Sequence, residues 1–197
     1  MKHHGYELAG QWNLATVNKR GFIVLTAGSL LLFGLTYFLG AVIREMLRLS
    51  WQLNIYIVPL PFMVLVAIFT AVVMMHEVIH GLAFLAFGRK PCFGFKLIRK
   101  FFPVFYTSSK GPPIPRDHYL LAALAPFLAM TVFLLITSVL ASDYRIASMA
   151  LMAMALNAAA STGDLWIAWN VRQHDTGTLF EDKTDGFNWY HPSKPEL

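Results

Sequence analysis

Long apolar segments alternate with short polar ones along this chain, and their lengths predict its architecture. A helix of about 20 apolar residues crosses the hydrocarbon core of a bilayer. Four segments are long and apolar enough to do so: about 21–43, 55–87, 118–141 and 147–171. The pattern therefore predicts an all-α membrane protein with about four transmembrane helices. We expect one membrane-embedded domain over residues 1–197, with a polar tail at 172–197.

Glycines and small residues within these segments predict how the helices pack and where one of them ends. The first segment contains no acidic or basic side chain, and Gly28, Gly34 and Gly40 would let a neighbouring helix approach closely. The second segment should remain helical to about Phe87, because Gly88 is a residue that commonly ends helices. We therefore expect the first helix to serve as an anchor that packs against the others.

Composition supports the membrane interpretation and excludes several other classes. Of the 197 residues, 56% are hydrophobic and only 14% are charged, whereas soluble domains have about 25% charged residues. The single cysteine, Cys92, rules out a disulfide within the chain and a cysteine-based zinc site. The net charge of +5 does not indicate nucleic acid binding, because the basic residues lie beside apolar segments, where they determine topology and contact lipid headgroups.

The loop at residues 88–117 is strongly basic and predicts the orientation of the chain. Its only acidic residue is Asp117, and it contains seven basic ones: Arg89, Lys90, Lys96, Arg99, Lys100, Lys110 and Arg116. Loops rich in lysine and arginine stay on the cytoplasmic side of a membrane. With four helices, we then expect a multi-pass protein of the cell (inner or plasma) membrane with both termini in the cytoplasm.

Parts of the same loop favour β-structure. The ranges 93–98 and 103–107 are rich in aromatic and branched residues, which predicts two short strands forming a hairpin at the membrane surface. The edge of such a strand could hold an extended substrate by β-addition. The candidate substrate-binding residues on it are Phe93, Phe95, Leu97, Val104 and Tyr106. The alternative is a basic interfacial loop that only fixes orientation.

The second apolar segment ends in an H-E-x-x-H motif formed by His76, Glu77 and His80. On a helix, residues four apart differ by about 40° of rotation and about 6 Å of rise, so the two histidines share one face and can share one metal ion. Zinc favours imidazole, and a catalytic zinc takes three protein ligands and leaves a position for water. Glu77 would then be the general base. The alternative is that both histidines are ordinary hydrogen-bonded groups of a core or interface.

Asp164 is the candidate third ligand. Apart from Glu77, it is the only acidic residue within an apolar segment, and the topology places it at the same depth as His76 and His80. A carboxylate in a membrane is costly unless a charge such as a metal ion compensates it. The alternative is that a lysine or arginine at the interface pairs with it.

Two further residues are candidates for roles around the metal. Asn157, seven residues before Asp164 and on nearly the same helix face, could hydrogen-bond a ligand or a developing oxyanion, or it could join two helices. His118, at the cytoplasmic start of the third segment, could orient substrate or stabilise charge. We favour the alternative that it reaches the interface from an apolar helix.

The motif His76–His80, followed in a later segment by Asn-x6-Asp, resembles the intramembrane zinc metalloproteases of the site-2 protease type. The match is closer to a small bacterial family called putative zincin peptidases, through this motif, the stretch 119–126 and Gly163-Asp164. The resemblance covers about 72–171. It implies one zinc ion held by His76, His80 and Asp164, with Glu77 as catalytic base. Gly163-Asp164 reverses the Asp-Gly order of the site-2 proteases, which leaves the substrate class open.

The sequence therefore predicts a zinc metallopeptidase with site-2-protease-like chemistry that hydrolyses a peptide bond in a membrane-protein or peptide substrate, within the membrane or at its surface. The alternative is a non-catalytic membrane scaffold or regulatory protein with a structural metal site. Such a site is closed and needs four ligands, so His118 or Asn157 would complete it. The sequence identifies neither the substrate nor the oligomeric state.

Overall fold

The computed structural model describes residues 2–3, 5–13, 17, 19–48, 61–98, 102–183 and 186–193. The chain divides into two compact units, each described here by itself. The mixed unit consists of Met1–Phe22, Glu77–Ala125 and Asp164–Leu197, and the helical unit consists of Ile23–His76 and Pro126–Gly163. The predicted start of the second helix, near residue 55, lies outside the described residues.

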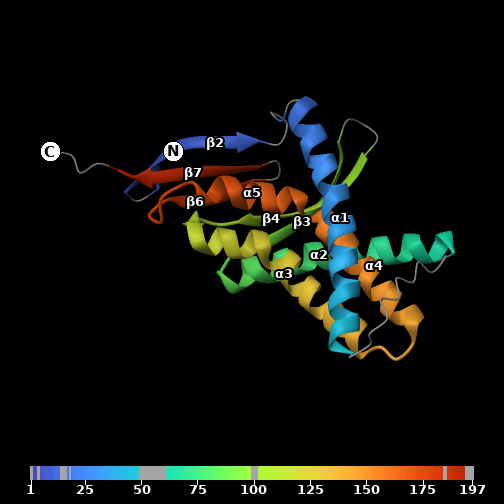
Figure 1. The fold of residues 1–197 in the computed structure, drawn as a ribbon. Coiled ribbons are helices and arrows are strands. Elements are labelled where there is room, and N and C mark those ends of the chain that lie inside the picture. Colours follow the sequence, from blue (N-terminus) through green and yellow to red (C-terminus); the bar gives the residue numbers. More distant parts are fainter. Residues whose placement is uncertain are drawn as a thin grey trace. The chain divides into compact units, whose positions relative to one another are not determined.

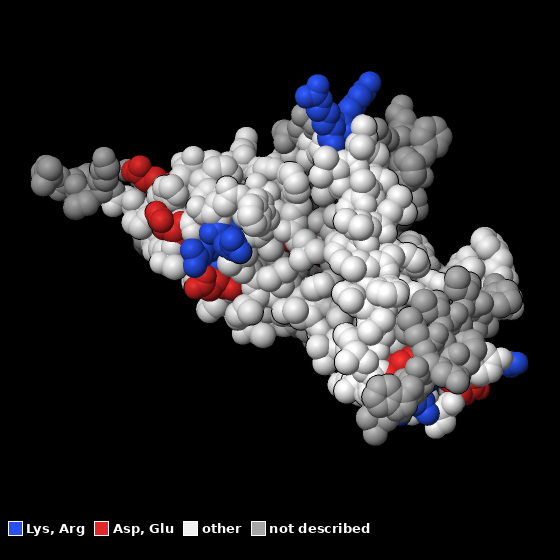
Figure 2. Space-filling model, viewed as in Figure 1, with Lys and Arg blue, Asp and Glu red and all other residues white. Residues whose placement is uncertain are grey.

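The helical unit contains most of α1 (Lys19–Leu47), the first part of α2 (Phe62–Ala86), the second part of α3 (Arg116–Leu140) and α4 (Tyr144–Ala160). The helices α1, α2 and α3 are each long and apolar enough to cross a membrane. Figure 2 shows no charged side chain on the surface of α1 between its two ends. The three corresponding helices of the prediction are therefore confirmed by length and composition.

The fourth predicted segment is not one straight helix. It consists of α4 and α5 (Thr162–Arg172), which would count as one membrane span only as a bent pair. At the break, the hydroxyl of Ser161 donates to the carbonyl of Asn157 at 2.8 Å, and so does the Ser161 amide at 2.9 Å. Serine hydroxyls compete with the backbone for helix carbonyls and often bend helices, which is the physical reason for the break.

Close approach between helices occurs at one of the predicted glycines. A side chain at Gly40 would collide with Met154 and Leu151 of α4, both of which are buried. A side chain at Gly34 would meet nothing. Small residues therefore matter at Gly40, where α1 packs against α4, and not along the whole of α1.

A buried ion pair lies near the C-terminal end of α1. Arg44 and Glu45 of α1 are both buried and paired with each other. Arg44 also donates from Nε to the carbonyl of Ser138 in the last turn of α3 at 2.8 Å. A cation at a helix C-terminus satisfies carbonyls that have no partner within the helix, so this pair joins α1 to the end of α3.

The mixed unit contains a five-stranded antiparallel sheet, so the prediction of an all-α protein is wrong in this respect. The strand order is β1-β2-β7-β6-β5, of which Figure 1 labels β2, β7 and β6. The strands are β1 (Lys2–His3), β2 (Tyr6–Asn13), β5 (Ile114–Pro115), β6 (Leu179–Lys183) and β7 (Gly186–Pro192). The strand β2 near the N-terminus pairs with β7, which lies in the segment predicted to be a polar tail.

Aromatic residues from the tail explain why this sheet forms. Phe180 of β6 and Phe187 of β7 are fully buried and pack on Tyr119 of α3 at ring-centroid distances of 5.5 and 5.9 Å. Phe84 of α2 contacts the other side of this cluster, 6.5 Å from Tyr119. Burial of aromatic side chains contributes strongly to stability, and here it holds β6 against the end of α2.

The predicted hairpin is confirmed as β3 (Lys90–Ile98) and β4 (Phe102–Lys110), which pair antiparallel in one continuous register. The second helix ends as predicted, since Gly88 adopts a φ of 70° after the last turn of α2. The hydroxyl of Thr107 in β4 donates to the carbonyl of Glu77 at 2.9 Å. This bond fastens β4 to the part of α2 that contains the H-E-x-x-H motif.

Candidate metal centre and adjoining cavity

The structure brings His76, His80 and Asp164 together. Both histidines are buried and lie one turn apart on the continuous helix α2, so the helix itself fixes their relative position. Asp164 lies in the first turn of α5, and its Oδ1 is 3.4 Å from Nε2 of His80. One ligand atom from each of the three residues lies within 4.8 Å of those of the other two.

A backbone carbonyl fixes the protonation of His80. Its Nδ1 lies 2.9 Å from the carbonyl oxygen of Ala122 in α3. A carbonyl oxygen can only accept a hydrogen bond, so Nδ1 must have the proton in this bond. The lone pair of the neutral ring is then on Nε2, the nitrogen that faces Asp164. Such a partner on the distal nitrogen is typical of histidines that bind metals.

The side chain of Asn157 determines which ring nitrogen of His76 has the proton in their hydrogen bond. The amide nitrogen of Asn157 donates to the carbonyl of Pro126 at 3.3 Å, which leaves its Oδ1 as the acceptor towards Nδ1 of His76 at 3.0 Å. His76 therefore donates from Nδ1 and has its lone pair on Nε2. Asn157 is fully buried, so its orientation is fixed by these bonds and by packing.

The donor set fits a zinc ion. It consists of two imidazole nitrogens and one carboxylate, all of them types that zinc accepts. Within the described part of the chain, the cluster of possible metal ligands consists of His76, His80 and Asp164. Three protein ligands leave one position of a tetrahedral site for water or substrate.

Glu77 and His118 occupy different surroundings. Glu77 is half-buried, follows His76 on α2 and is close enough to His80 to interact with it electrostatically. His118 is exposed, and its ring stacks on Phe87 at a centroid distance of 4.4 Å. The structure therefore places Glu77 at the cluster and leaves His118 outside it.

The candidate substrate-binding residues of the hairpin are partly described. Phe93 and Phe95 are 58% and 54% exposed, and Tyr106 is half-buried. The ring of Phe93 lies against Gly81, one residue after the H-E-x-x-H motif. Leu97 and Val104 are paired with Pro103 and Lys96 through their backbones, and their side chains lie outside the described part of the structure.

Comparison with known protein families identifies the relatives of this chain. A family model described as "Putative zincin peptidase" matches residues 68–179, which is more than half of the chain. The chain belongs to the putative zincin peptidase family. The matched region contains the H-E-x-x-H motif, Asn157 and Asp164. Comparison with curated proteins and with solved structures found no match.

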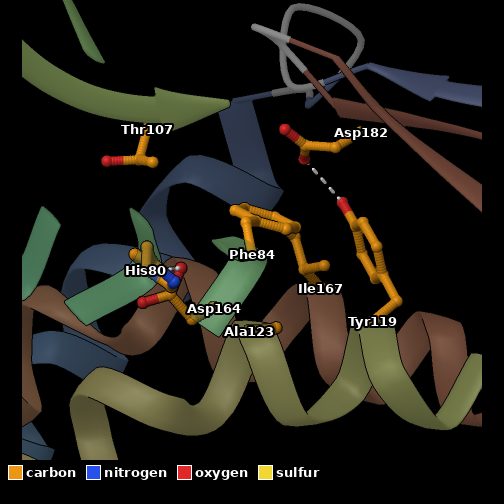
Figure 3. Close-up of a pocket in the computed structure, with 8 residues that line it drawn as sticks. All are labelled: His80, Phe84, Thr107, Tyr119, Ala123, Asp164, Ile167 and Asp182. Carbon is orange, nitrogen blue, oxygen red and sulfur yellow. Dashed lines mark hydrogen bonds and ion pairs between the residues drawn. The ribbon is translucent and has the colours of Figure 1, made fainter. Parts of the chain in front are cut away.

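This member of the putative zincin peptidase family has a cavity of about 70 Å³ beside the candidate metal ligands (Figure 3). All of its lining residues belong to the mixed unit. They are His80, Phe84, Thr107, Tyr119, Ala123, Asp164, Ile167 and Asp182. The cavity thus extends from the candidate ligands His80 and Asp164 to the sheet.

Asp182 of β6 forms the end of the cavity away from the candidate ligands His80 and Asp164. Its Oδ1 accepts from the hydroxyl of Tyr119 at 2.9 Å, and its Oδ2 accepts from the amide of Ser109 in β4 at 2.8 Å. Burial raises the pKa of the Asp182 carboxyl to about 7, against the opposing effect of these two donors. Sequence analysis missed this residue, because nothing in its spacing relates it to the motif 102 positions earlier in the chain.

Proposed function

We propose that this chain is a zinc-dependent peptidase that hydrolyses a peptide bond of a membrane-associated substrate. The observation that supports this most directly is the state of the two histidines. His76 and His80 each donate from Nδ1 to a fixed acceptor, which makes Nε2 the nitrogen of each neutral ring that can bind a metal, and one ligand atom from each lies close to Asp164. One zinc ion held by these three residues matches the family description.

Zinc bound at this site would supply Lewis-acid chemistry, which polarises a peptide carbonyl and makes water more acidic. Glu77 would take a proton from the attacking water, whose oxygen forms the new bond to the carbonyl carbon. As the carbon–nitrogen bond breaks, Glu77 would give that proton to the leaving amine. Asn157 and the carbonyl of Ala122 would keep the two imidazole rings in place during these steps.

We further propose that the reaction takes place at or just inside the cytoplasmic face of a cell membrane. Three helices have the length and composition of membrane spans, and the H-E-x-x-H motif lies in the second half of α2, which the basic loop follows. The hairpin of β3 and β4 would then lie at the membrane surface. Both termini would be cytoplasmic.

A substrate must be extended before its peptide bonds are accessible, and β4 offers an edge for that purpose. Amide groups alternate in direction along a strand. The amide of Ser109 points away from β3 towards Asp182, so the amides of Thr107 and Phe105 face the same side. We propose that an extended substrate pairs with this part of β4, where Thr107 lines the cavity.

Replacement of the proposed base tests this function. Glu77→Gln keeps the shape of the side chain and removes its ability to take a proton. We expect the variant to bind zinc as the wild type does and to cleave a membrane-associated test substrate at least about 100-fold more slowly. Unchanged cleavage by Glu77→Gln would exclude Glu77 from the reaction. An X-ray absorption spectrum showing four protein ligands on zinc would favour a structural metal site instead.

A further inference from the structure

The cavity has two chemically different ends. In Figure 3, His80 and Asp164 lie at one end, and the hydrogen-bonded pair of Tyr119 and Asp182 lies at the other. Phe84 and Ile167 are located between them. The path from the metal ligands to the carboxylate of Asp182 therefore has apolar walls.

The size of the cavity limits what can enter it. An engineered cavity of about 150 Å³ holds benzene, which has six non-hydrogen atoms. The cavity beside His80 has a volume of about 70 Å³. By proportion it accommodates about three non-hydrogen atoms, which is the size of a threonine, serine or valine side chain. The stems of lysine and arginine are too long for it.

Within the described part of the structure, Asp182 has acceptor capacity that the protein does not use. A carboxylate has about four lone-pair sites, and Tyr119 and Ser109 each occupy one. The neighbouring cation Lys183 is bonded to Glu181 instead. A buried carboxylate with free acceptor sites favours a ligand that brings a hydrogen-bond donor to it.

We propose that this cavity is the subsite for the substrate residue next to the scissile bond, and that it selects a short side chain with a hydrogen-bond donor, namely serine or threonine. Asp182 is the residue that determines this specificity, since it accepts the bond from the substrate hydroxyl. This inference rests on the zinc peptidase function proposed above, because the metal ligands place the scissile bond beside the cavity.

Valine gives the sharpest comparison, because it has the shape of threonine without the hydroxyl. A valine side chain would fit the cavity and would cover Asp182 without offering it a donor. A site that hydrogen-bonds a hydroxyl discriminates strongly against an analogue that lacks it. Alanine would fit but would form no such bond.

The test uses small probes whose binding does not require cleavage. Hydroxamates chelate zinc and hold the adjacent side chain beside the metal. We would measure binding of N-acetyl-threonine hydroxamate and N-acetyl-valine hydroxamate to the full-length, zinc-loaded protein by calorimetry at pH 8. The wild type should bind the threonine probe about tenfold more tightly, because a hydrogen bond to a charged acceptor is lost with valine.

Three variants make the assignment specific to the cavity. Asp182→Asn should reduce the preference for threonine to about twofold or less. Ala123→Leu, which fills the cavity from α3, should weaken both probes and leave acetohydroxamate, which has only a methyl group, unaffected. Glu181→Gln is the matched control: Glu181 neighbours Asp182 on β6 but bonds Lys183, Asn188 and Tyr190, so this variant should keep the tenfold preference.

The outcomes separate this inference from the proposed function. Equal binding of the two probes by the wild type overturns the subsite assignment alone, and so does an unchanged tenfold preference in Asp182→Asn. If the wild type binds neither these probes nor acetohydroxamate, the open zinc site fails as well, and the proposed function falls with it.

Discussion

Asn157 accepts a hydrogen bond from Nδ1 of His76 at 3.0 Å, and this bond sets which nitrogen of His76 is available to a metal. Asn157 can do so because its own amide donates to the carbonyl of Pro126. The two residues are 81 positions apart in the chain, in helices α4 and α2. The relationship makes Asn157 a positioning residue for the metal centre.

We predict that Asn157→Leu lowers zinc affinity by about 10–100-fold, the usual effect of removing a residue that orients a metal ligand. Asn157→Asp keeps an acceptor for His76 and should restore part of that affinity. Competition titrations with a fluorescent zinc chelator measure both. Equal zinc affinity in the wild type and Asn157→Leu would mean that the bond does not position His76.

The bond between Thr107 and Glu77 predicts a local effect on the hairpin. Thr107→Val keeps the shape of the side chain and removes the hydroxyl that binds the carbonyl of Glu77. The lost bond costs about 1 kcal/mol. We expect the amides of β3 and β4 to exchange with deuterium faster, while those of β6 and β7 are unchanged. If exchange became faster to the same extent in both sheets, the hydrogen bond from Thr107 to Glu77 would not be stabilising the hairpin specifically.

The raised pKa of Asp182 predicts a change of stability with pH. Burial disfavours the charged carboxylate, so its pKa is about 7 in the folded protein and close to 3.8 in the unfolded chain. The stability from this group is complete below about pH 3.8 and is lost as the pH rises through 7. The charges facing Asp182 are those of His80 and Lys183, and the donors are Tyr119 and Ser109.

The variant Asp182→Asn has no carboxylate to ionise. Between pH 5 and pH 8, the thermal midpoint of this variant should therefore rise relative to that of the wild type. Differential scanning fluorimetry of the zinc-free proteins measures it. Glu181→Gln should show a nearly constant difference over this range: despite the opposing effect of burial, the bonds from Lys183, Tyr190 and Asn188 lower the pKa of Glu181 below its ordinary value of 4.5, so its contribution is lost only at more acidic pH. A constant difference for Asp182→Asn would contradict the raised pKa.

Gly40 and Gly34 form a matched pair for testing helix packing. Gly40→Leu should destabilise the protein by about 1–3 kcal/mol, because a side chain there collides with Met154 and Leu151. Gly34→Leu extends into open space and should be neutral or slightly stabilising. Thermal unfolding in detergent micelles compares the two. Equal loss of stability would show that the contact at Gly40 is not the cause.

The sequence predicted those parts of the protein that depend on local pattern. Helical spacing placed His76 and His80 on one face, and the aromatic and branched residues of 93–98 and 103–107 predicted the hairpin. Asp164 was identified because a carboxylate is costly in an apolar segment. The family resemblance proposed from these residues agrees with the matching family model.

What the sequence did not predict depends on contacts between distant segments. The strand β2 pairs with β7, nearly the whole chain apart, and β7 lies in the segment that was predicted only as a polar tail. Asp182 reaches the cavity only because Phe180 and Phe187 pack on Tyr119 and hold the sheet against the helices. The break at Ser161 arises from a side-chain hydrogen bond, and the spacing of hydrophobic residues gives no sign of such a bond.

The central claim is that His76, His80 and Asp164 hold one zinc ion together. Its most direct test is the zinc content of the purified protein, measured by plasma mass spectrometry after dialysis against a weak chelator. We predict about one zinc per chain for the wild type and for the control His118→Ala, and less than about 0.1 for His76→Ala, His80→Ala and Asp164→Ala. Full zinc content in Asp164→Ala would contradict the claim.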